Sequence, residues 1–410
     1  MPDPTSHPEA MYAFINASLD KLADWRSEQL NLDGGCGLIG RKAGALHRDW
    51  LYSFSSDAYL NERIHPGTIH YDDIEAVCID LFKEVYRADY VDLNAMSAGT
   101  ANMALLCALT KRGDSVMAFA DPLGHNSLRS DGLAGFMDLR VEDIPYDPAT
   151  LELDLERFRE TALRVRPSLI LLGSALYLFM EPFNEIRRIA DEVGAYVSCD
   201  VSHTFGIIPS GALPNPLDEG VDVLVGGTYK TFCAPCKGII LTNRREIYDR
   251  VHKTMPRLIY SNNANYVPAL TQALMELKAY GEAYGAALIK NARALAGEME
   301  KVGFDMCFKE RGYTQTHLIA ARMNGTDRQG MIDLLTSANI LCSTVPCDAE
   351  HFYLRPATLV TARQGFTEAD MPVFARLLHQ AVHLGRTEET KAEVRALMRD
   401  HAETILFSLS

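Results

Sequence analysis

The sequence predicts an α/β protein with a mostly parallel seven-stranded sheet, followed by a smaller α/β unit. Between residues 90 and 245, apolar runs of strand length alternate with segments of helical spacing, which is typical of a parallel sheet with helices on both faces. We expect strands at 90–93, 115–120, 139–144, 168–172, 196–200, 221–225 and 238–242. Helices fit between most of them, at 101–110, 155–165 and 185–193.

The first seventy residues form a different kind of segment. Residues 10–30 show helical spacing and predict an N-terminal helical arm. Residues 31–70 are irregular and rich in Gly, Ser, His and aromatic side chains, which is uncommon for a plain linker and indicates a lining of a site or an interface. Helical spacing returns at 74–86.

The C-terminal part begins with long helices at 267–303. The smaller unit has expected strands near 318–322 and 353–355, with helices near 331–338 and 371–384 and a charged helical tail at 386–410. We therefore expect three parts: an arm with an active-site or dimer segment at 1–70, a large domain at 71–265, and linking helices with a small domain at 266–410.

The composition excludes several classes of function. The 410 residues are 47% hydrophobic and 23% charged, as in a globular enzyme, and the net charge of -14 argues against nucleic acid as a partner. The longest apolar runs have strand length, and the N-terminus lacks a basic stretch followed by an apolar core, so neither a membrane span nor a secretory signal is expected. Nine scattered cysteines suit reduced thiols and a cytoplasmic location.

Cys233 and Cys236 form the single Cys-x-x-Cys pair. A redox site needs such a pair at a helix start, and a zinc site needs a second pair of ligands, which the sequence lacks. We interpret the pair as a loop segment and expect no metal site.

An aspartate and a lysine follow two expected strands. Asp200 ends the strand 196–200, and Lys230 lies in the run Gly226-Gly227-Thr228-Tyr229-Lys230-Thr231 after the strand 221–225. Carboxyl ends of neighbouring parallel strands meet at one crevice. Pyridoxal phosphate (PLP) enzymes need a lysine for the Schiff base and a carboxylate that keeps the pyridine nitrogen protonated. Each residue alone is more typical of a turn or a solvated loop, but their order indicates a PLP site.

Other segments supply the parts that such a site needs. Ser97-Ala98-Gly99-Thr100-Ala101-Asn102 follows a strand and opens a helix, as a phosphate cradle or a plain N-cap does; with the lysine, we favour the cradle. His125 lies after the next strand, where a ring could stack on a cofactor, although a loop histidine more often faces solvent. His203 lies three residues after Asp200, and Arg355 could grip a carboxylate or be an ordinary surface arginine.

Together these segments resemble serine hydroxymethyltransferase and its relatives among the fold-type I PLP enzymes, over residues 55–385. The similarity lies in the phosphate segment Ser97-Ala98-Gly99-Thr100-Ala101-Asn102, in Asp200-Val201-Ser202-His203, in Gly227-Thr228-Tyr229-Lys230-Thr231, in Pro235-Cys236-Lys237-Gly238, and in Leu354-Arg355 with Ala362-Arg363-Gln364-Gly365-Phe366.

The resemblance implies roles for these residues. Lys230 would form the Schiff base, Arg355 would bind the substrate carboxylate, and His125 would stack on the cofactor ring. Ser174 would lie near the phenolic oxygen of the cofactor. The matched segments also imply cofactor contacts from Ser97, Ala98, Gly99, Thr100, Asp200, His203, Thr228 and Tyr229.

The folate half of the family pattern is largely absent. In the segment that carries the general-base glutamate and the folate-contacting tyrosines, an ungapped register places Asp57 at the glutamate and His65 at a tyrosine, and a shifted register uses Glu62. Cys347 stands at the folate-contacting asparagine. Gly312-Tyr313-Thr314-Gln315-Thr316-His317 resembles the threonine transaldolases, a folate-independent branch that makes β-hydroxy amino acids in specialised metabolism.

We therefore expect a PLP enzyme that makes or breaks the Cα–Cβ bond of a β-hydroxy amino acid, such as threonine or serine, and transfers the glycyl carbanion to an aldehyde without folate. Asp57, Glu62 or His125 would move the proton of the β-hydroxyl group. The alternatives are a folate-dependent serine or α-methylserine hydroxymethyltransferase, and an aminotransferase or β-eliminating lyase on the same fold. The resemblance also implies a homodimer or a dimer of dimers.

Overall fold

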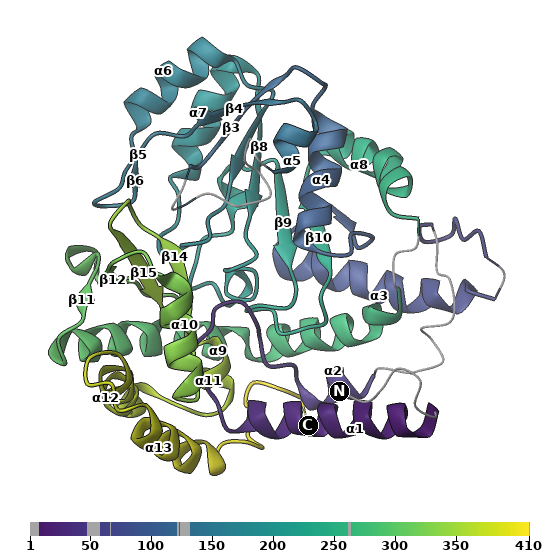
Figure 1. Cartoon of the computed structure of the whole chain (residues 1–410). Helices are drawn as coiled ribbons and strands as arrows, with labels where there is room; N and C mark the ends of the chain where they lie inside the picture. Colours follow the sequence, from purple (N-terminus) through teal and green to yellow (C-terminus); the bar gives the residue numbers. More distant parts are fainter. Residues whose placement is uncertain are drawn as a thin grey trace.

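The seven-stranded α/β fold is confirmed by a computed structural model, which describes residues 8–46, 58–65, 67–120, 123, 132–260 and 264–409 (Figure 1). The central sheet has the order β2-β10-β9-β8-β7-β3-β4. Only β10 runs antiparallel to its neighbours β2 and β9. Its strands are β2 (Tyr90–Asp92), β3 (Ser115–Ala118), β4 (Arg140–Asp143), β7 (Leu169–Leu172), β8 (Tyr196–Asp200), β9 (Val223–Gly227) and β10 (Gly238–Thr242).

Helices cover both faces of this sheet because side chains alternate along each strand. Leu169 and Leu171 pack in the core that contains α4 and α8. Ile170 and Leu172 pack in the core on the opposite face, which contains α3, α6, α7 and α9. The helices are α3 (Ile69–Tyr86), α4 (Ala98–Leu109), α5 (Leu133–Phe136), α6 (Leu155–Val165), α7 (Phe183–Val193), α8 (Arg245–Leu258) and α9 (Val267–Lys301).

A second core belongs to the C-terminal part, which lies at the lower left of Figure 1. Its antiparallel sheet has the order β11-β12-β15-β14. The strands are β11 (Asp305–Met306), β12 (Ala321–Asn324), β14 (Ser343–Pro346) and β15 (His351–Arg355), and the helices are α10 (Arg328–Ser337), α11 (Leu359–Arg363), α12 (Met371–Val382) and α13 (Thr387–Arg399). We refer to this part as the small domain.

One strand of the small domain begins later than the sequence pattern suggests. Residues 318–322 are apolar enough for a strand, but β12 begins at Ala321. Leu318 forms only an isolated bridge with Ala357. The preceding Thr316 uses its hydroxyl to donate to the carbonyl of Tyr177 at 2.7 Å, so this stretch is tied to the large domain instead of to the small sheet.

The N-terminal segment connects the two parts. Helix α1 (Pro8–Ser27) has no buried residue and exposes Tyr12, Leu19 and Leu22. After it, β1 (Leu30–Asn31) pairs in parallel with β13 (Ile340–Leu341) of the small domain, and a short helix, α2 (Arg41–Ala45), contacts α9.

A separate hairpin is formed by β5 (Tyr146–Asp147) and β6 (Glu152–Leu153). Among the described helices, none is long and apolar enough to cross a membrane.

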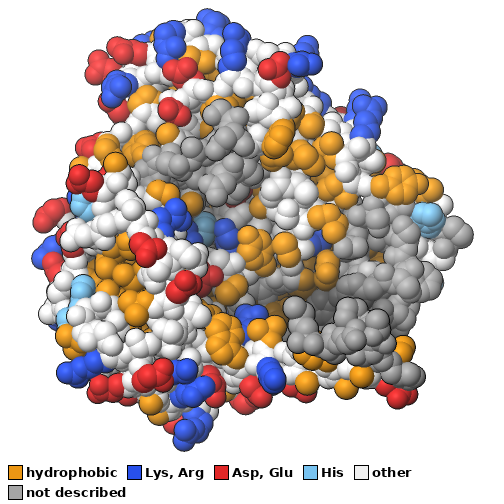
Figure 2. All heavy atoms as spheres, in the orientation of Figure 1, with side chains coloured by type: hydrophobic (Ala, Val, Ile, Leu, Met, Phe, Trp, Pro, Cys, Tyr) orange, Lys and Arg blue, Asp and Glu red, His pale blue; other side chains and the backbone are white. Residues whose placement is uncertain are grey.

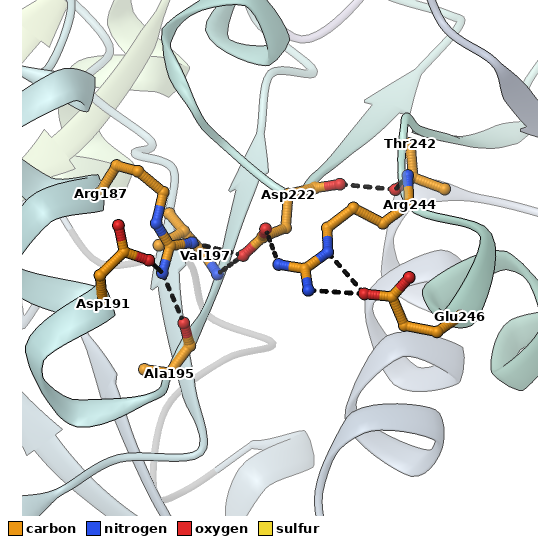
Figure 3. Close-up of polar contacts among 8 residues, drawn as sticks. All are labelled: Arg187, Asp191, Ala195, Val197, Asp222, Thr242, Arg244 and Glu246. Atoms are coloured by element: carbon orange, nitrogen blue, oxygen red, sulfur yellow. Dashed lines mark hydrogen bonds and ion pairs between the residues drawn. The ribbon is translucent and has the colours of Figure 1, made fainter.

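A cluster of charged side chains lies at the amino ends of the parallel strands of the central sheet (Figure 3). The Asp222 carboxylate, just before β9, accepts hydrogen bonds from Arg187 Nη1 at 2.7 Å, from Arg244 Nη1 at 2.6 Å and from the Val197 backbone N–H at 2.7 Å. These contacts join α7, β8, β9 and the start of α8. The cluster lies at the amino ends of the parallel strands and leaves their carboxyl ends free for a site.

Candidate active site

The site residues lie where β8 and β9 end. Asp200 is the last residue of β8, and Lys230 follows the end of β9 at Gly227 by three residues. The two strands are parallel neighbours, with Asp200 opposite Val225. The strand-end pattern therefore brings these two residues to the same edge of the sheet, as the sequence predicts.

Lys230 is the buried amine of the site. Its Nζ lies 3.0 Å from His203 Nε2. Burial lowers the pKa of Lys230 to about 8, while the charge of Asp200 raises it and that of Arg355 lowers it. The uncharged fraction of this amine at neutral pH is therefore much larger than for an ordinary lysine, as a nucleophilic amine requires, although the charged form still predominates.

Asp200 is buried and fixed in orientation by three donors. Its Oδ1 accepts from the Ser202 backbone N–H at 2.9 Å and from Ser202 Oγ at 2.5 Å, and its Oδ2 accepts from Asn102 Nδ2 at 2.7 Å. The backbone of Gly173, at φ +131°, lies directly against Asp200. A Cβ added to this glycine would lie 2.9 Å from Asp200 Cβ. A carboxylate held in this way can hold a proton on a ligand atom at one fixed position.

The first turn of α4 lies beside the lysine loop. An added Cβ on Gly227, at the end of β9, would lie 3.5 Å from Ala98 Cβ. Ser97 caps the helix: its Oγ accepts from Thr100 N at 3.2 Å, and Thr100 Oγ1 accepts from Ser97 N at 2.8 Å. The N–H groups of Ala98 and Gly99 belong to the first turn, which has no intrahelical acceptors for them. This helix start is able to bind an anion such as a phosphate.

Two other residues matched to cofactor contacts are engaged within the protein. Thr228 Oγ1 accepts from Lys237 N at 2.8 Å and donates to the carbonyl of Pro235, so it closes the loop that carries Lys230. Ser174 is buried, and its Oγ accepts from Leu176 N at 2.9 Å. Tyr229 lies beside the amine, with Lys230 Nζ 5.8 Å from its ring centroid.

Arg355 enters the site from the small domain. It ends β15, is 8% exposed, and donates from Nε and Nη2 to Ser343 Oγ at 3.2 and 3.0 Å. Its Nη1 donates to the carbonyl of Ala175 in the large domain. Arg355 therefore spans the two parts of the protein, and it is a buried fork donor instead of the ordinary surface arginine that the sequence also allowed. In the space-filling view, basic and histidine side chains lie together in the hollow between these parts (Figure 2).

Two expected residues, Glu62 and His65, are placed away from this edge, and the structure does not describe two others. His125 and Asp57 lie outside the described residues. Glu62 is exposed and pairs with His252 Nε2 on α8 at 3.5 Å. His65 lies in the turn before α3, where its carbonyl accepts from Thr68 Oγ1 at 2.7 Å. The lysine-loop cysteines, Cys233 and Cys236, are free thiols.

Two residues of the site were not selected from the sequence, although their motifs were. Asn102 donates to Asp200 and belongs to the phosphate segment. His317 is completely buried, and its ring stacks on that of His203 with centroids 5.8 Å apart. Burial, then Arg355 and Lys230, lower the pKa of His317 to about 3, so its imidazole is neutral. No cluster that could hold a metal ion occurs among the described side chains.

Comparison with known proteins decides the family. Residues 49–378 match the family model of serine hydroxymethyltransferase. Serine hydroxymethyltransferases from Archaeoglobus fulgidus and Methanopyrus kandleri are each 33% identical to this chain, over 83% of its length and 80% and 82% of theirs. The chain belongs to the serine hydroxymethyltransferase family. It is thus a PLP-dependent enzyme of the transferase and aldolase class, and the resemblance seen in its motifs is confirmed.

A solved structure confirms the fold. L-Threonine transaldolase from Pseudomonas fluorescens superimposes with a TM-score of 0.90, covering 98% of this chain and 94% of the other, at 23% sequence identity. The fold-type I architecture, with its N-terminal arm and smaller C-terminal α/β part, is therefore shared with that protein.

Proposed function

We propose that this enzyme makes or breaks the Cα–Cβ bond of a β-hydroxy amino acid such as threonine or serine, and transfers the resulting glycyl unit to an aldehyde without folate. The observation that supports this most is the convergence of Lys230, Asp200 and Arg355 from two domains at one edge of the sheet. The amine fits the aldehyde of the cofactor, the carboxylate fits its pyridine nitrogen, and the guanidinium fits the carboxylate of a substrate.

The residues present fit PLP. Lys230 offers a buried amine with a lowered pKa, Asp200 a fixed carboxylate, and the start of α4 a set of first-turn N–H groups. When bound, PLP supplies an electron-withdrawing ring that accepts the electron pair left at Cα. Lys230 would hold the cofactor, Ala98 and Gly99 would face its phosphate, and His203 would lie beside it.

The residues of the chain have distinct roles in this proposal. Asp200 would hold a proton on the pyridine nitrogen, because a charge-assisted hydrogen bond favours the charged form. Arg355 would orient the substrate carboxylate. Asp57, Glu62 and His125 stay the candidates for moving the proton of the β-hydroxyl group. The contact between the two domains, where Arg355 donates to the carbonyl of Ala175, would help to exclude water from the reacting atoms.

Folate independence is supported by the residue that replaces the family asparagine. Cys347 Sγ lies 3.7 Å from Asp348 Oδ2, and burial raises its pKa, so it stays a thiol. A thiol is only a weak donor and acceptor and cannot provide the paired hydrogen bonds of an amide. The names of the curated relatives favour the alternative, a folate-dependent serine hydroxymethyltransferase.

We also propose that the enzyme is a homodimer or a dimer of dimers. Helix α1 buries none of its 20 residues and leaves Tyr12 70% and Leu19 57% exposed, an apolar surface that association would cover. Sedimentation at micromolar concentration should give a dimer or a larger species, and a fully active monomer would exclude it. All nine cysteines are free thiols, which supports the proposal of a cytoplasmic location.

Two experiments test this proposal, the first on the attachment of the cofactor and the second on the reaction. Borohydride reduction of the holoenzyme followed by peptide mapping should place the pyridoxyl group on Lys230. Lys237 is a matched internal control, since it is also buried and its pKa is also lowered to about 8. A label on Lys237 would refute the assignment.

A substrate screen separates the candidate reactions. Threonine and serine are supplied with and without tetrahydrofolate, together with a series of aldehydes, and acetaldehyde, glycine and new β-hydroxy amino acids are measured. The proposal expects folate-independent transfer to an aldehyde. Folate-stimulated conversion of serine to glycine, with micromolar folate binding, would instead establish the hydroxymethyltransferase. Keto acid or ammonia as the main product would establish an aminotransferase or a lyase.

A further inference from the structure

A glycine-rich segment places one acidic residue, Asp33, beside the lysine loop and the small domain. Residues 33–37 read Asp33-Gly34-Gly35-Cys36-Gly37 and follow β1, which is paired with β13 of the small domain. Gly37 N–H donates to the carbonyl of Tyr229 at 2.6 Å, so this segment is also bonded to the lysine loop. Asp33 is therefore held between the loop of Lys230 and the small domain that carries Arg355.

Gly37 is needed for this close approach. A Cβ added to Gly37 would lie 2.2 Å from the carbonyl oxygen of Lys230, and one added to Gly34 would lie 2.7 Å from Leu318 Cδ2 and 3.9 Å from His203 Cε1. A distance of 2.2 Å to a backbone oxygen is too short for a real contact, so a side chain at position 37 would push the segment away from the lysine loop, whereas at position 34 a shift of the Leu318 side chain would relieve the contact. The segment is therefore built to bring the backbone beside Asp33 against the site.

The guanidinium group of Arg355 contacts no carboxylate among the described residues. Its hydrogen bonds to described residues all go to uncharged oxygens, those of Ser343 and Ala175. Burial lowers the pKa of Arg355 and of Lys230, and the negative charge of Asp33 counteracts part of this lowering at both cations. No residue in the described part of the chain donates a hydrogen bond to the Asp33 carboxylate, and Asp33 lines a cavity of about 270 Å³ together with Ile332, Thr336, Leu341, Cys342 and Ser343.

Asp33 and Ser343 line the same cavity, and the Ser343 hydroxyl accepts two hydrogen bonds from Arg355, so the carboxylate and the guanidinium are both neighbours of Ser343. A free α-amino acid carries a carboxylate and an ammonium group on adjacent atoms. We propose that Asp33 binds the α-ammonium group of the incoming amino acid while Arg355 binds its carboxylate, so that the amine is delivered beside Lys230. This inference rests on the proposed function, since it assigns how the same site recognises its amino acid substrate.

If Asp33 binds the ammonium group, its charge affects an amino acid and a simple acid in opposite directions. A carboxylate near Arg355 attracts an ammonium group but repels a second carboxylate. Removing the charge of Asp33 should therefore weaken the binding of an amino acid and strengthen the binding of the same kind of acid without an amine. A structural defect would weaken both ligands.

The test measures binding to the holoenzyme by calorimetry, with glycine as the amino acid and 3-hydroxybutyrate, the deamino analogue of threonine, as the simple acid. For Asp33→Asn we expect the Kd of glycine to rise at least tenfold and the Kd of 3-hydroxybutyrate to fall. Asp305→Asn, at an exposed carboxylate on β11, is the matched control and should leave both values unchanged. Asp33→Ser provides a second uncharged variant if the first is poorly folded by circular dichroism.

A second variant, Arg355→Gln, tests the proposed substrate site separately from the role of Asp33. If Arg355→Gln leaves the binding of both ligands intact, the proposed substrate site itself is wrong. If Arg355→Gln weakens both, but Asp33→Asn leaves glycine binding unchanged or changes both ligands in the same direction, only the role of Asp33 is refuted. A loss of kcat in Asp33→Asn with unchanged Kd for glycine would assign Asp33 to proton transfer and also refute its role in binding the ammonium.

Discussion

The buried His317 should make the protein sensitive to acid in a measurable way. Its ring is completely buried, and neither ring nitrogen has a hydrogen-bond partner in the described part of the chain. Its surroundings lower the pKa from 6.5 to about 3, first by burial and then through the charges of Arg355 and Lys230. Replacing the ring by phenylalanine keeps its shape and its stacking on His203 while removing the titrating group.

The direction of the effect follows from proton uptake. Below about pH 6.5 the unfolded chain protonates His317, whereas the folded protein holds the imidazole neutral down to about pH 3. The unfolded state therefore binds more protons in this window, and the free energy of unfolding falls as the pH is lowered. The full stabilisation is present above pH 6.5. With these two values the loss between pH 7 and pH 5 is about 2 kcal/mol, and the total is about 5 kcal/mol.

Urea denaturation of the cofactor-free protein at pH 7 and pH 5 measures this loss. We expect the free energy of unfolding of the wild type to fall by about 2 kcal/mol more than that of His317→Phe over this interval. At pH 7 the variant should be equally or more stable, because two buried ring nitrogens without partners are removed. His70→Phe, at a histidine whose side chain is 88% exposed, is the control. An equal pH dependence in the wild type and His317→Phe would refute the reasoning.

Three further predictions concern other residues. Asp200→Asn should keep the fold, by circular dichroism, and lower kcat/KM at least a hundredfold (about 3 kcal/mol) because a neutral amide cannot hold the charged form of the pyridine ring; near-normal turnover would contradict this role. Asp222→Ala should lower the free energy of unfolding by roughly 3 kcal/mol, measured in urea, because it leaves the half-buried Arg187 without its buried partner; a loss below about 1 kcal/mol would show that water replaces the carboxylate. The rate at which the cofactor-free protein captures PLP should rise with pH with a midpoint near the lowered Lys230 pKa of about 8, followed by absorbance; a midpoint near 10.5 would contradict the effect of burial.

The sequence predicts the large sheet well because its strands combine burial on both faces with clear separation by helices. Leu169–Leu172, for example, is buried at every position, and its strand is found where the apolar run predicts it. The strand-end rule also places Asp200 and Lys230 at one edge without any structural information. Both features depend on residues close in sequence, so local patterns contain them.

Other features depend on contacts between distant segments. Asp33 and His317 reach the site only because β1 pairs with a strand some 300 residues away in the chain, and because Thr314 and Thr316 bond to the large domain. No local pattern records such contacts. Glu62 illustrates the converse: its position in a family register made it a candidate, yet within this chain it pairs with His252 on α8.

The charges of the site explain why His317 must be neutral and why Asp33 matters. Lys230 and Arg355 are two buried cations, and a protonated His317 beside them would add a third in a region of low dielectric constant. Its low pKa removes that charge above about pH 3. In the proposed site, Asp200 and Asp33 supply the negative charges, the first for the cofactor and the second for the substrate amine. On this basis the affinity of the holoenzyme for an amino acid should be the same in the wild type and in His317→Phe between pH 7 and 9, because the imidazole is neutral throughout this range.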